Sequence, residues 1–267
     1  METVASWQKR RQFELTQEDI IDGLLCPGAG YVVVAGRTGI GKSVFTMQLA
    51  FSLATGTDFL GMIIKRKVNV GMFLFEGSSD KVDDRFTKMS KSFSSDARQN
   101  IRFELRKPPF HINKNFSNII KQVEGCEVVI FDPGKYMVFG DYISVRDANK
   151  FAEILLDLAE IGNFIPIICW QIRKPNNNSL IYPGDISEIK GAADYVESSA
   201  TTFLLEKARR GHRSGGPGSG TEGRGFAPTD PDKVTLYLCK ARDSERENWS
   251  LELQLNREKL LFEPLNP

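Results

Sequence analysis

The sequence lacks the features of several large protein classes. Its longest wholly apolar run, Phe164–Trp170, is far shorter than the ~18–20 residues of a membrane span. No apolar stretch follows the basic residues near the N-terminus, so no secretory signal is predicted. Charge of one sign is not in excess either, because 35 Lys and Arg balance 34 Asp and Glu for a formal net charge of +1. This balance excludes a histone-like polycation.

Cysteine and histidine are scarce, with four and two residues respectively. The cysteines are widely scattered, show no metal-ligand spacing and are expected to be buried thiols in a reducing cytoplasm: Cys26, Cys126, Cys169 and Cys239. The remaining composition, 41% hydrophobic and 26% charged, is that of a globular protein and excludes general disorder.

What is present is an alternation of apolar strands and periodic helices within 267 residues, a length that suits one large α/β domain. Strands are predicted at Tyr31–Ala35, Val68–Phe75, Val128–Phe131, Phe164–Trp170, Thr201–Leu205, Val234–Cys239 and Leu251–Leu255. Helices are predicted at Ser43–Thr55 and around Phe151–Leu158, with Gly162 as a stop. The early strands are continuously apolar and the last two alternate. We expect a mostly parallel sheet flanked by helices, finished by a C-terminal antiparallel hairpin.

The expected organisation is a lead-in segment over residues 1–30 and one α/β domain over residues 31–267. A loop is predicted at Arg173–Glu188, and a flexible Gly-rich stretch at about 211–231. Basic residues flank that stretch and form either a solvated run or an electrostatic tether: Lys207, Arg209, Arg210, His212, Arg213 and Arg224.

The decisive motif is Gly36-Arg37-Thr38-Gly39-Ile40-Gly41-Lys42-Ser43, a full match to G-x-x-x-x-G-K-[ST] between a predicted strand and a predicted helix. Glycines let backbone N–H groups point at phosphate oxygens, and the helix N-terminus favours the same anion. Lys42 would reach the β- and γ-phosphates of ATP, and the Ser43 hydroxyl would bind Mg²⁺.

Two carboxylates are candidates for the rest of the chemistry. Asp132 ends the run Val128–Phe131, where it would orient Mg²⁺ or its water, although it could also simply begin a turn before Pro133. Glu76 follows another apolar run and could activate the attacking water, or could instead cap the next helix.

At these residues the chain resembles RecA-like P-loop ATPases, in the branch that contains plasmid RepA-type and DnaB-type hexameric helicases. The resemblance is carried by Ile20–Leu25, Tyr31–Ser43, Ala54–Gly61 and Val70–Glu76. It implies that Glu76 activates water, with Asp80 as the alternative carboxylate, and that Asp132 takes the Walker B place.

In the second half of the chain, the resemblance implies that Gln171 senses the γ-phosphate. Lys240 and Arg242 are similar to a Lys-x-Arg element that reaches a neighbouring subunit's nucleotide, although they could also be a solvated hairpin end. Nucleic-acid contacts are expected from two loops, through Lys135, Tyr136, Arg146, Arg173 and Lys174.

The resemblance therefore implies a Mg²⁺-dependent ATPase that acts on single-stranded DNA as a homo-oligomer, expected to be a hexameric ring. Replication or recombination proteins are the expected further partners, with no membrane association and a cytoplasmic location. A helicase is the most concrete form. The alternative is a nucleotide-switched loader or recombination protein of the same fold that does not unwind DNA.

Overall fold

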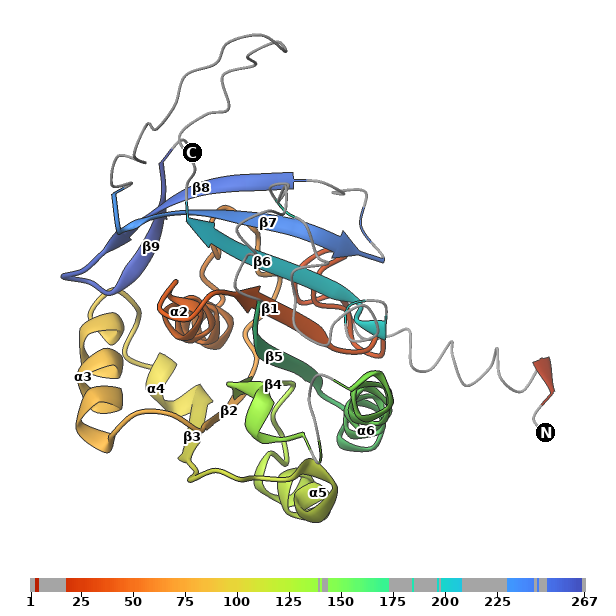
Figure 1. The fold of residues 1–267 in the computed structure, drawn as a ribbon. Helices are drawn as coiled ribbons and strands as arrows, with labels where there is room; N and C mark the ends of the chain where they lie inside the picture. The colour runs from red at the N-terminus through yellow and green to blue at the C-terminus, as the bar shows by residue number, and fades with distance from the viewer. Residues whose placement is uncertain are drawn as a thin grey trace, which may run out of the picture.

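The computed structural model describes residues 3–4, 18–138, 140, 144–172, 184, 196, 198–207, 230–242, 244 and 249–265. Strands and helices alternate through the first part of the chain, and strands alone follow (Figure 1). The first part comprises β1 (Val32–Gly36), α2 (Lys42–Thr55), β2 (Val70–Leu74), α3 (Ser79–Ser90), α4 (Ala97–Asn100), β3 (Ile101–Leu105), α5 (Ile112–Gln122), β4 (Val128–Asp132), the 3₁₀ turn η1 (Gly134–Tyr136), α6 (Val145–Gly162) and β5 (Ile165–Gln171). The second part comprises β6 (Thr201–Lys207), β7 (Lys233–Ala241), β8 (Trp249–Asn256) and β9 (Leu261–Pro264).

Within the described residues the strands form one nine-stranded sheet in the order β3-β2-β4-β5-β1-β6-β7-β8-β9. Neighbours from β3 to β6 pair in parallel, and β6 to β9 pair antiparallel. The predicted fold class, a mostly parallel α/β sheet with an antiparallel C-terminal end, is confirmed. The predicted hairpin is β7–β8, and β9 adds a strand to it that the sequence did not predict.

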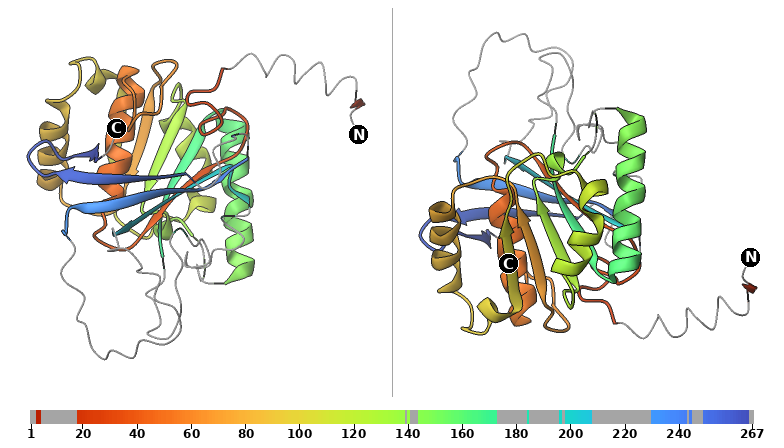
Figure 2. Two further views of the ribbon diagram at one scale, coloured as in Figure 1. Left: turned by 90° about the horizontal axis from the view of Figure 1, so that it is seen from above. Right: turned by 90° about the horizontal axis from the view of Figure 1, so that it is seen from below.

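Helices cover the two faces of the parallel part of the sheet. The helices α2, α3 and α4 lie on one face and α5 and α6 on the other (Figures 1 and 2). Alternate residues of β1 follow this division: Val32 and Val34 belong to the core cluster that contains α2, and Val33 and Ala35 to the cluster that contains α6. Burial of both faces explains why this strand is continuously apolar.

The segment before β1 contributes to the same core. Ile20, Leu24 and Leu25 are at most 2% exposed and belong to the α2-side cluster. The carbonyl of Leu24 also accepts a hydrogen bond from Thr201 Oγ1 at 2.8 Å. This segment is therefore packed against the sheet, while the boundary at residue 30 stays a prediction. The predicted loops at 173–188 and 211–231 lie almost wholly outside the described residues.

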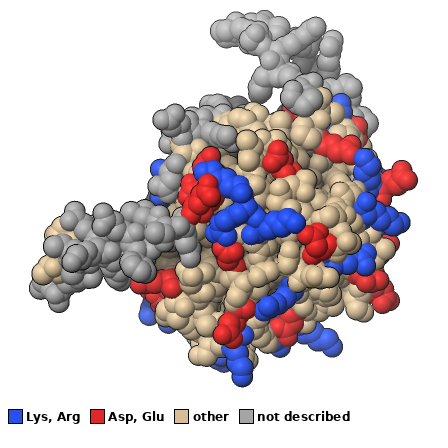
Figure 3. Space-filling view, turned by 180° about the vertical axis from the view of Figure 1, so that it is seen from behind, with Lys and Arg blue, Asp and Glu red and all other residues tan. Residues whose placement is uncertain are grey.

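The surface charge is mixed where it can be seen. On the face in Figure 3, Lys and Arg side chains lie among Asp and Glu side chains rather than in a field of one sign. Ion pairs elsewhere in the chain show the same pairing, for example Arg66 with Glu127 at 2.5 Å and Lys67 with Asp96 at 2.8 Å. Among the described helices, none combines the length and apolar character needed to cross a membrane.

Candidate active site

The candidate site lies where four parallel strands end. Gly36 ends β1, Asp132 ends β4 and Gln171 ends β5, and Glu76 follows β2 by two residues. Parallel strands direct their carboxyl ends to one edge of a sheet, which is the usual ligand-binding edge of open α/β folds. The topology therefore brings together residues that are far apart in the sequence.

The P-loop needs glycine at two positions for different reasons. A Cβ at Gly36 would lie 2.9 Å from Ile40 Cγ2 and 2.9 Å from the Leu205 carbonyl, so the loop passes too close to β6 for a side chain. Gly41 has φ +103°, and a Cβ there would lie 2.6 Å from the Phe262 ring. The backbone can therefore enter α2 with its first N–H groups exposed to a phosphate.

Lys42 is the lysine of the P-loop motif, and its ammonium group lies against the loop itself. Its Nζ donates hydrogen bonds of 2.9 Å to the carbonyls of Gly36 and Arg37. Burial lowers the pKa of Lys42, whereas the negative charges of Asp132 and Glu76 act in the opposite direction. A phosphate at the loop would add a further charge that favours the ammonium form.

Ser43 and Asp132 join the start of α2 to the end of β4. The Ser43 hydroxyl donates a hydrogen bond to the carboxylate of Asp132, which is 7% exposed. Burial raises the pKa of Asp132, although the Ser43 hydrogen bond and the Lys42 charge lower it. Asp132 therefore contacts Ser43 at the start of α2 as well as preceding the turn at Pro133, and its role at Mg²⁺ stays a prediction.

These two oxygen ligands fit Mg²⁺. This cation usually binds one or two protein oxygens together with substrate phosphates. The described residues contain no group of three His, Cys, Asp or Glu side chains that could form an all-protein metal cage. The residues present therefore fit a Mg²⁺ ion that would be bound jointly by Ser43, Asp132 and the phosphates of a nucleotide.

Glu76 is held by two side chains from the η1 turn (Gly134–Tyr136). Lys135 Nζ lies 2.9 Å from Glu76 Oε1, and the Tyr136 hydroxyl donates to the same oxygen at 2.9 Å. Partial burial would raise the pKa of Glu76, but these two hydrogen bonds and the Lys135 charge hold it below its usual value. The helix α3 begins at N-cap Ser78, so Glu76 is not its cap.

Gln171 contacts the P-loop directly. It pairs with Gly36 in the β5–β1 register, and its Nε2 donates to Thr38 Oγ1 at 2.9 Å. The side chain is thus placed beside the loop that would hold the phosphates, as the predicted sensor role requires.

Lys240 and Arg242 lie at the opposite edge of the sheet. β7 runs antiparallel to β6, so Ala241 pairs with Thr201, at the end of β6 farthest from the P-loop. The Arg242 N–H donates to the Ala200 carbonyl at 3.1 Å, and Lys240 Nζ donates to the Val196 carbonyl at 2.6 Å. The five residues of β1 separate this edge from the P-loop, a distance of about 16 Å at ~3.3 Å per residue.

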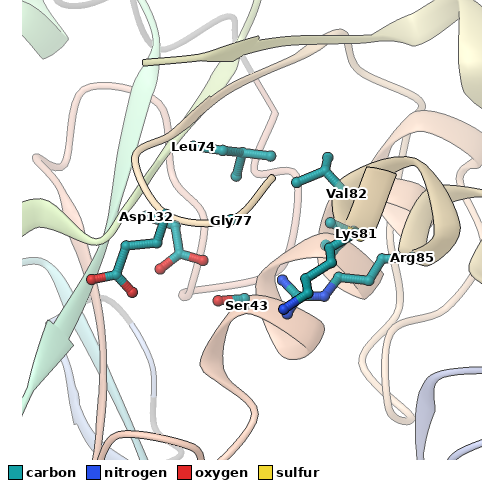
Figure 4. A pocket seen from close by; sticks show the side chains of 9 residues that line it. Ser43, Leu74, Gly77, Lys81, Val82, Arg85 and Asp132 are labelled. Carbon is teal, nitrogen blue, oxygen red and sulfur yellow. The ribbon is translucent and has the colours of Figure 1, made fainter. Parts of the chain in front are cut away.

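Two cations that the sequence did not single out line the site. A cavity of about 240 Å³ is bordered by Ser43, Glu76 and Asp132 on one side and by Lys81 and Arg85 of α3 on the other. Figure 4 shows both cationic side chains extending from α3 towards Ser43. The four-residue spacing between Lys81 and Arg85 was the available signal, because residues i and i+4 share a helix face.

The predicted nucleic-acid residues do not form one group. Lys135 and Tyr136 are engaged with Glu76, and Arg146 is exposed in the first turn of α6. Arg173 and Lys174 lie outside the described residues. Their contact with nucleic acid stays a prediction.

Comparison with known proteins agrees with this geometry. A family model described as AAA domain matches residues 3–177, more than half of the chain. A solved structure of a DnaB-like replicative helicase, described with its interactions with primase, matches with a TM-score of 0.66 and 13% identity. That match covers 98% of this chain and 68% of that chain. A second solved structure, described as an ATPase domain, matches with a TM-score of 0.65 and 14% identity, covering 98% of each chain.

No curated protein matches the chain. At these identities the structural likenesses establish the fold, which is that of RecA-like P-loop ATPases of the DnaB type. The resemblance expected from the sequence is confirmed at this level.

Proposed function

The chain belongs to the AAA domain family, and on this premise we propose that it hydrolyses ATP with Mg²⁺ and couples hydrolysis to binding or translocation of single-stranded DNA. The observation that carries the proposal is the convergence of four groups at one sheet edge: a P-loop lysine, a Ser–Asp pair, a carboxylate and a glutamine. A P-loop alone, or this fold alone, would not require the Ser–Asp pair, the carboxylate and the glutamine to lie beside the lysine.

Each group has a role in phosphoryl transfer. Lys42 and the loop N–H groups bind and orient the β- and γ-phosphates, and Ser43 with Asp132 holds Mg²⁺. The bound Mg²⁺ would neutralise charge that develops on the phosphate oxygens. Glu76 orients and deprotonates the attacking water, for which its lowered pKa keeps it ionised at neutral pH. Gln171, which is hydrogen-bonded to Thr38 of the P-loop, would contact the γ-phosphate.

The proposed assembly is a homo-oligomeric ring. Arg242 lies too far from its own P-loop to reach it, since β1 separates the two edges. A guanidinium from a neighbouring copy would supply the charge that phosphoryl transfer uses as an arginine finger. The expected assembly is a hexamer on single-stranded DNA, with replication or recombination proteins as further partners.

The test is steady-state ATP turnover by the purified protein with Mg²⁺, with and without single-stranded DNA. We expect DNA to stimulate turnover. Glu76→Gln should lower turnover by about 10²–10⁴-fold while ATP remains bound, because an amide has nearly the same shape but is a poor base. Normal turnover by Glu76→Gln would transfer the role to Asp80.

Strand displacement on a forked duplex separates the motor from its alternative. A motor displaces the strand in an ATP-dependent way. Turnover without displacement would favour the nucleotide-switched loader or recombination protein.

A further inference from the structure

Cys169 of β5 is a buried thiol that lies between the P-loop helix and Asp132. It is 0% exposed and is a free cysteine. Its Sγ lies 3.7 Å from Thr46 Oγ1 on α2, and its thiol also hydrogen-bonds the carboxylate of Asp132 on β4. Three elements of the candidate site, α2, β4 and β5, therefore meet at one sulfur atom.

The sheet register places this thiol and this carboxylate side by side. The parallel pairing of β4 with β5 sets Ile130 opposite Ile167, and both side chains belong to the core cluster that contains α2. Asp132 and Cys169 follow two residues later on their respective strands, and side chains two residues apart share a face of a sheet. Both groups therefore face α2, and strand pairing rather than a single rotamer brings them together.

The thiol proton has two acceptors within reach, and their chemistry decides between them. Thr46 Oγ1 donates its own proton to the Lys42 carbonyl at 3.1 Å and is a neutral acceptor. An ionised Asp132 is a charged acceptor, and hydrogen bonds to ionised groups are about twice as strong as neutral ones. The S–H group therefore donates preferentially to the carboxylate, while Thr46 contacts the sulfur from α2.

Asp132 consequently has two donors on two different elements. Ser43 of α2 and Cys169 of β5 both hydrogen-bond its carboxylate. One hydrogen bond would leave the carboxylate free to rotate about its Cβ–Cγ bond, whereas two donors on separate elements restrict that rotation. Hydrogen bonds to the carboxylates of metal sites orient these ligands and raise the affinity for the metal.

We propose that Cys169 is a positioning residue for the Mg²⁺ site, whose thiol holds the Asp132 carboxylate in the orientation that binds Mg²⁺ together with Ser43 and a nucleotide. The proposal rests on the ATPase function proposed above, and it adds a residue that acts on the metal only through Asp132. Gln171, two residues further along β5, contacts the P-loop from the same strand. One strand thus supports both the metal ligand and the phosphate-binding loop.

The alternative is a thiol that only fills space, and a Mg²⁺ titration distinguishes the two. The affinity for a non-hydrolysable ATP analogue is measured in EDTA and over a range of Mg²⁺ concentrations, for the wild type, Cys169→Ala and Cys169→Ser. We expect Cys169→Ala to raise the half-saturating Mg²⁺ concentration about tenfold, the effect of removing a hydrogen-bond partner of a metal ligand. The affinity in EDTA should stay near that of the wild type, which also shows that the variant folds.

The serine variant separates orientation from packing. Serine keeps a donor at this position, so Cys169→Ser should have a half-saturating Mg²⁺ concentration near that of the wild type. A role in packing alone predicts the opposite order, because a buried hydroxyl costs more desolvation free energy than the apolar side chain of alanine.

Cys126→Ala is the matched control. Cys126 is also buried, at 4% exposed, but belongs to the core cluster on the α5 side, so its replacement should leave the Mg²⁺ dependence unchanged. The proposal would be overturned by a wild-type Mg²⁺ dependence in Cys169→Ala, by an equal increase in Cys169→Ser, or by an equal loss of affinity in EDTA. A wild-type protein that binds no nucleotide, or binds it independently of Mg²⁺, would instead overturn the proposed function.

Discussion

The parallel and antiparallel halves of the sheet place their polar residues at opposite edges. In the parallel half, strand ends converge, so Gly36, Asp132 and Gln171 meet at one edge although the sequence separates them widely. In the antiparallel half, β7 returns from that edge and delivers Lys240 and Arg242 to the other. One half therefore builds a site within the chain, and the other presents cations away from it.

The difference explains how one fold could make an active site depend on assembly. Under the proposed function, the chain's own residues would bind the phosphates, Mg²⁺ and the attacking water, and cationic side chains of the P-loop and α3 lie at this site. A neighbouring copy would need to contribute only the opposite edge. The following predictions test whether the two halves act separately, starting with the largest expected effect.

Removing the P-loop cation should have the largest effect. Lys42→Ala should abolish measurable ATP turnover and strongly weaken nucleotide binding, because it removes the ammonium group that would contact the β- and γ-phosphates. Turnover and nucleotide affinity are measured on the purified variant. Wild-type turnover by this variant would show that the P-loop is not the site of ATP hydrolysis, and the parallel half would then not hold the active site.

Removing the distant arginine should affect turnover but not nucleotide binding. Arg242→Ala should bind ATP nearly normally and lose about 10³-fold or more of turnover, the contribution of an arginine finger. Mixing it with Lys42→Ala should restore part of the activity, because one interface then combines an intact P-loop with an intact Arg242.

The mixing experiment has a clear opposite outcome. No recovery on mixing, or a wild-type specific activity independent of protein concentration, would show that Arg242 does not complete a neighbour's site. The antiparallel half would then have no role in hydrolysis, and the monomeric nucleotide switch would be favoured.

The sequence predicted the parallel half better than the antiparallel one. Continuous apolar runs mark β1 and β4 because both faces are buried, and the P-loop is a local motif. The edge strand β3 was not predicted, because Arg102 and Glu104 interrupt it and Phe103 is 51% exposed. β9 is short and ends at Pro264, and no local pattern separates it from a loop.

Some contacts of the candidate site could not be predicted from the sequence either. Lys135 was predicted to contact nucleic acid, but its ion pair with Glu76 depends on how β2 and η1 lie in space. The direction of Lys81 and Arg85 depends on the packing of Val82, which a charge pattern does not reveal. Local chemistry was thus predictable, whereas orientation required the assembled sheet.

The smallest expected effect concerns the contact that joins the two halves. Gln48 of α2 donates from Nε2 to the Phe262 carbonyl at 3.0 Å and accepts from the Phe262 N–H at 2.8 Å, across 214 residues of sequence. Gln48 is 7% exposed and Phe262 is 2% exposed. The Gln48 side-chain amide therefore pairs with both the N–H and the carbonyl of Phe262 in β9. Because Gln48 belongs to α2, this contact ties β9 to the helix that begins at the P-loop.

Gln48→Met keeps the length of the side chain but removes both hydrogen bonds. We expect a loss of about 2–4 kcal/mol in the free energy of unfolding, because two buried backbone groups lose their partners. Urea denaturation measures the loss, and Gln99→Met, an exposed change on α4, is the control and should leave the urea midpoint unchanged. Below the unfolding transition, nucleotide affinity should stay near that of the wild type, because Lys42 and Ser43 remain in place. Unchanged stability would mean that this contact does not hold β9, and that β6–β7 pairing and the packing of Leu253 and Phe262 in the α2-side core attach the antiparallel half.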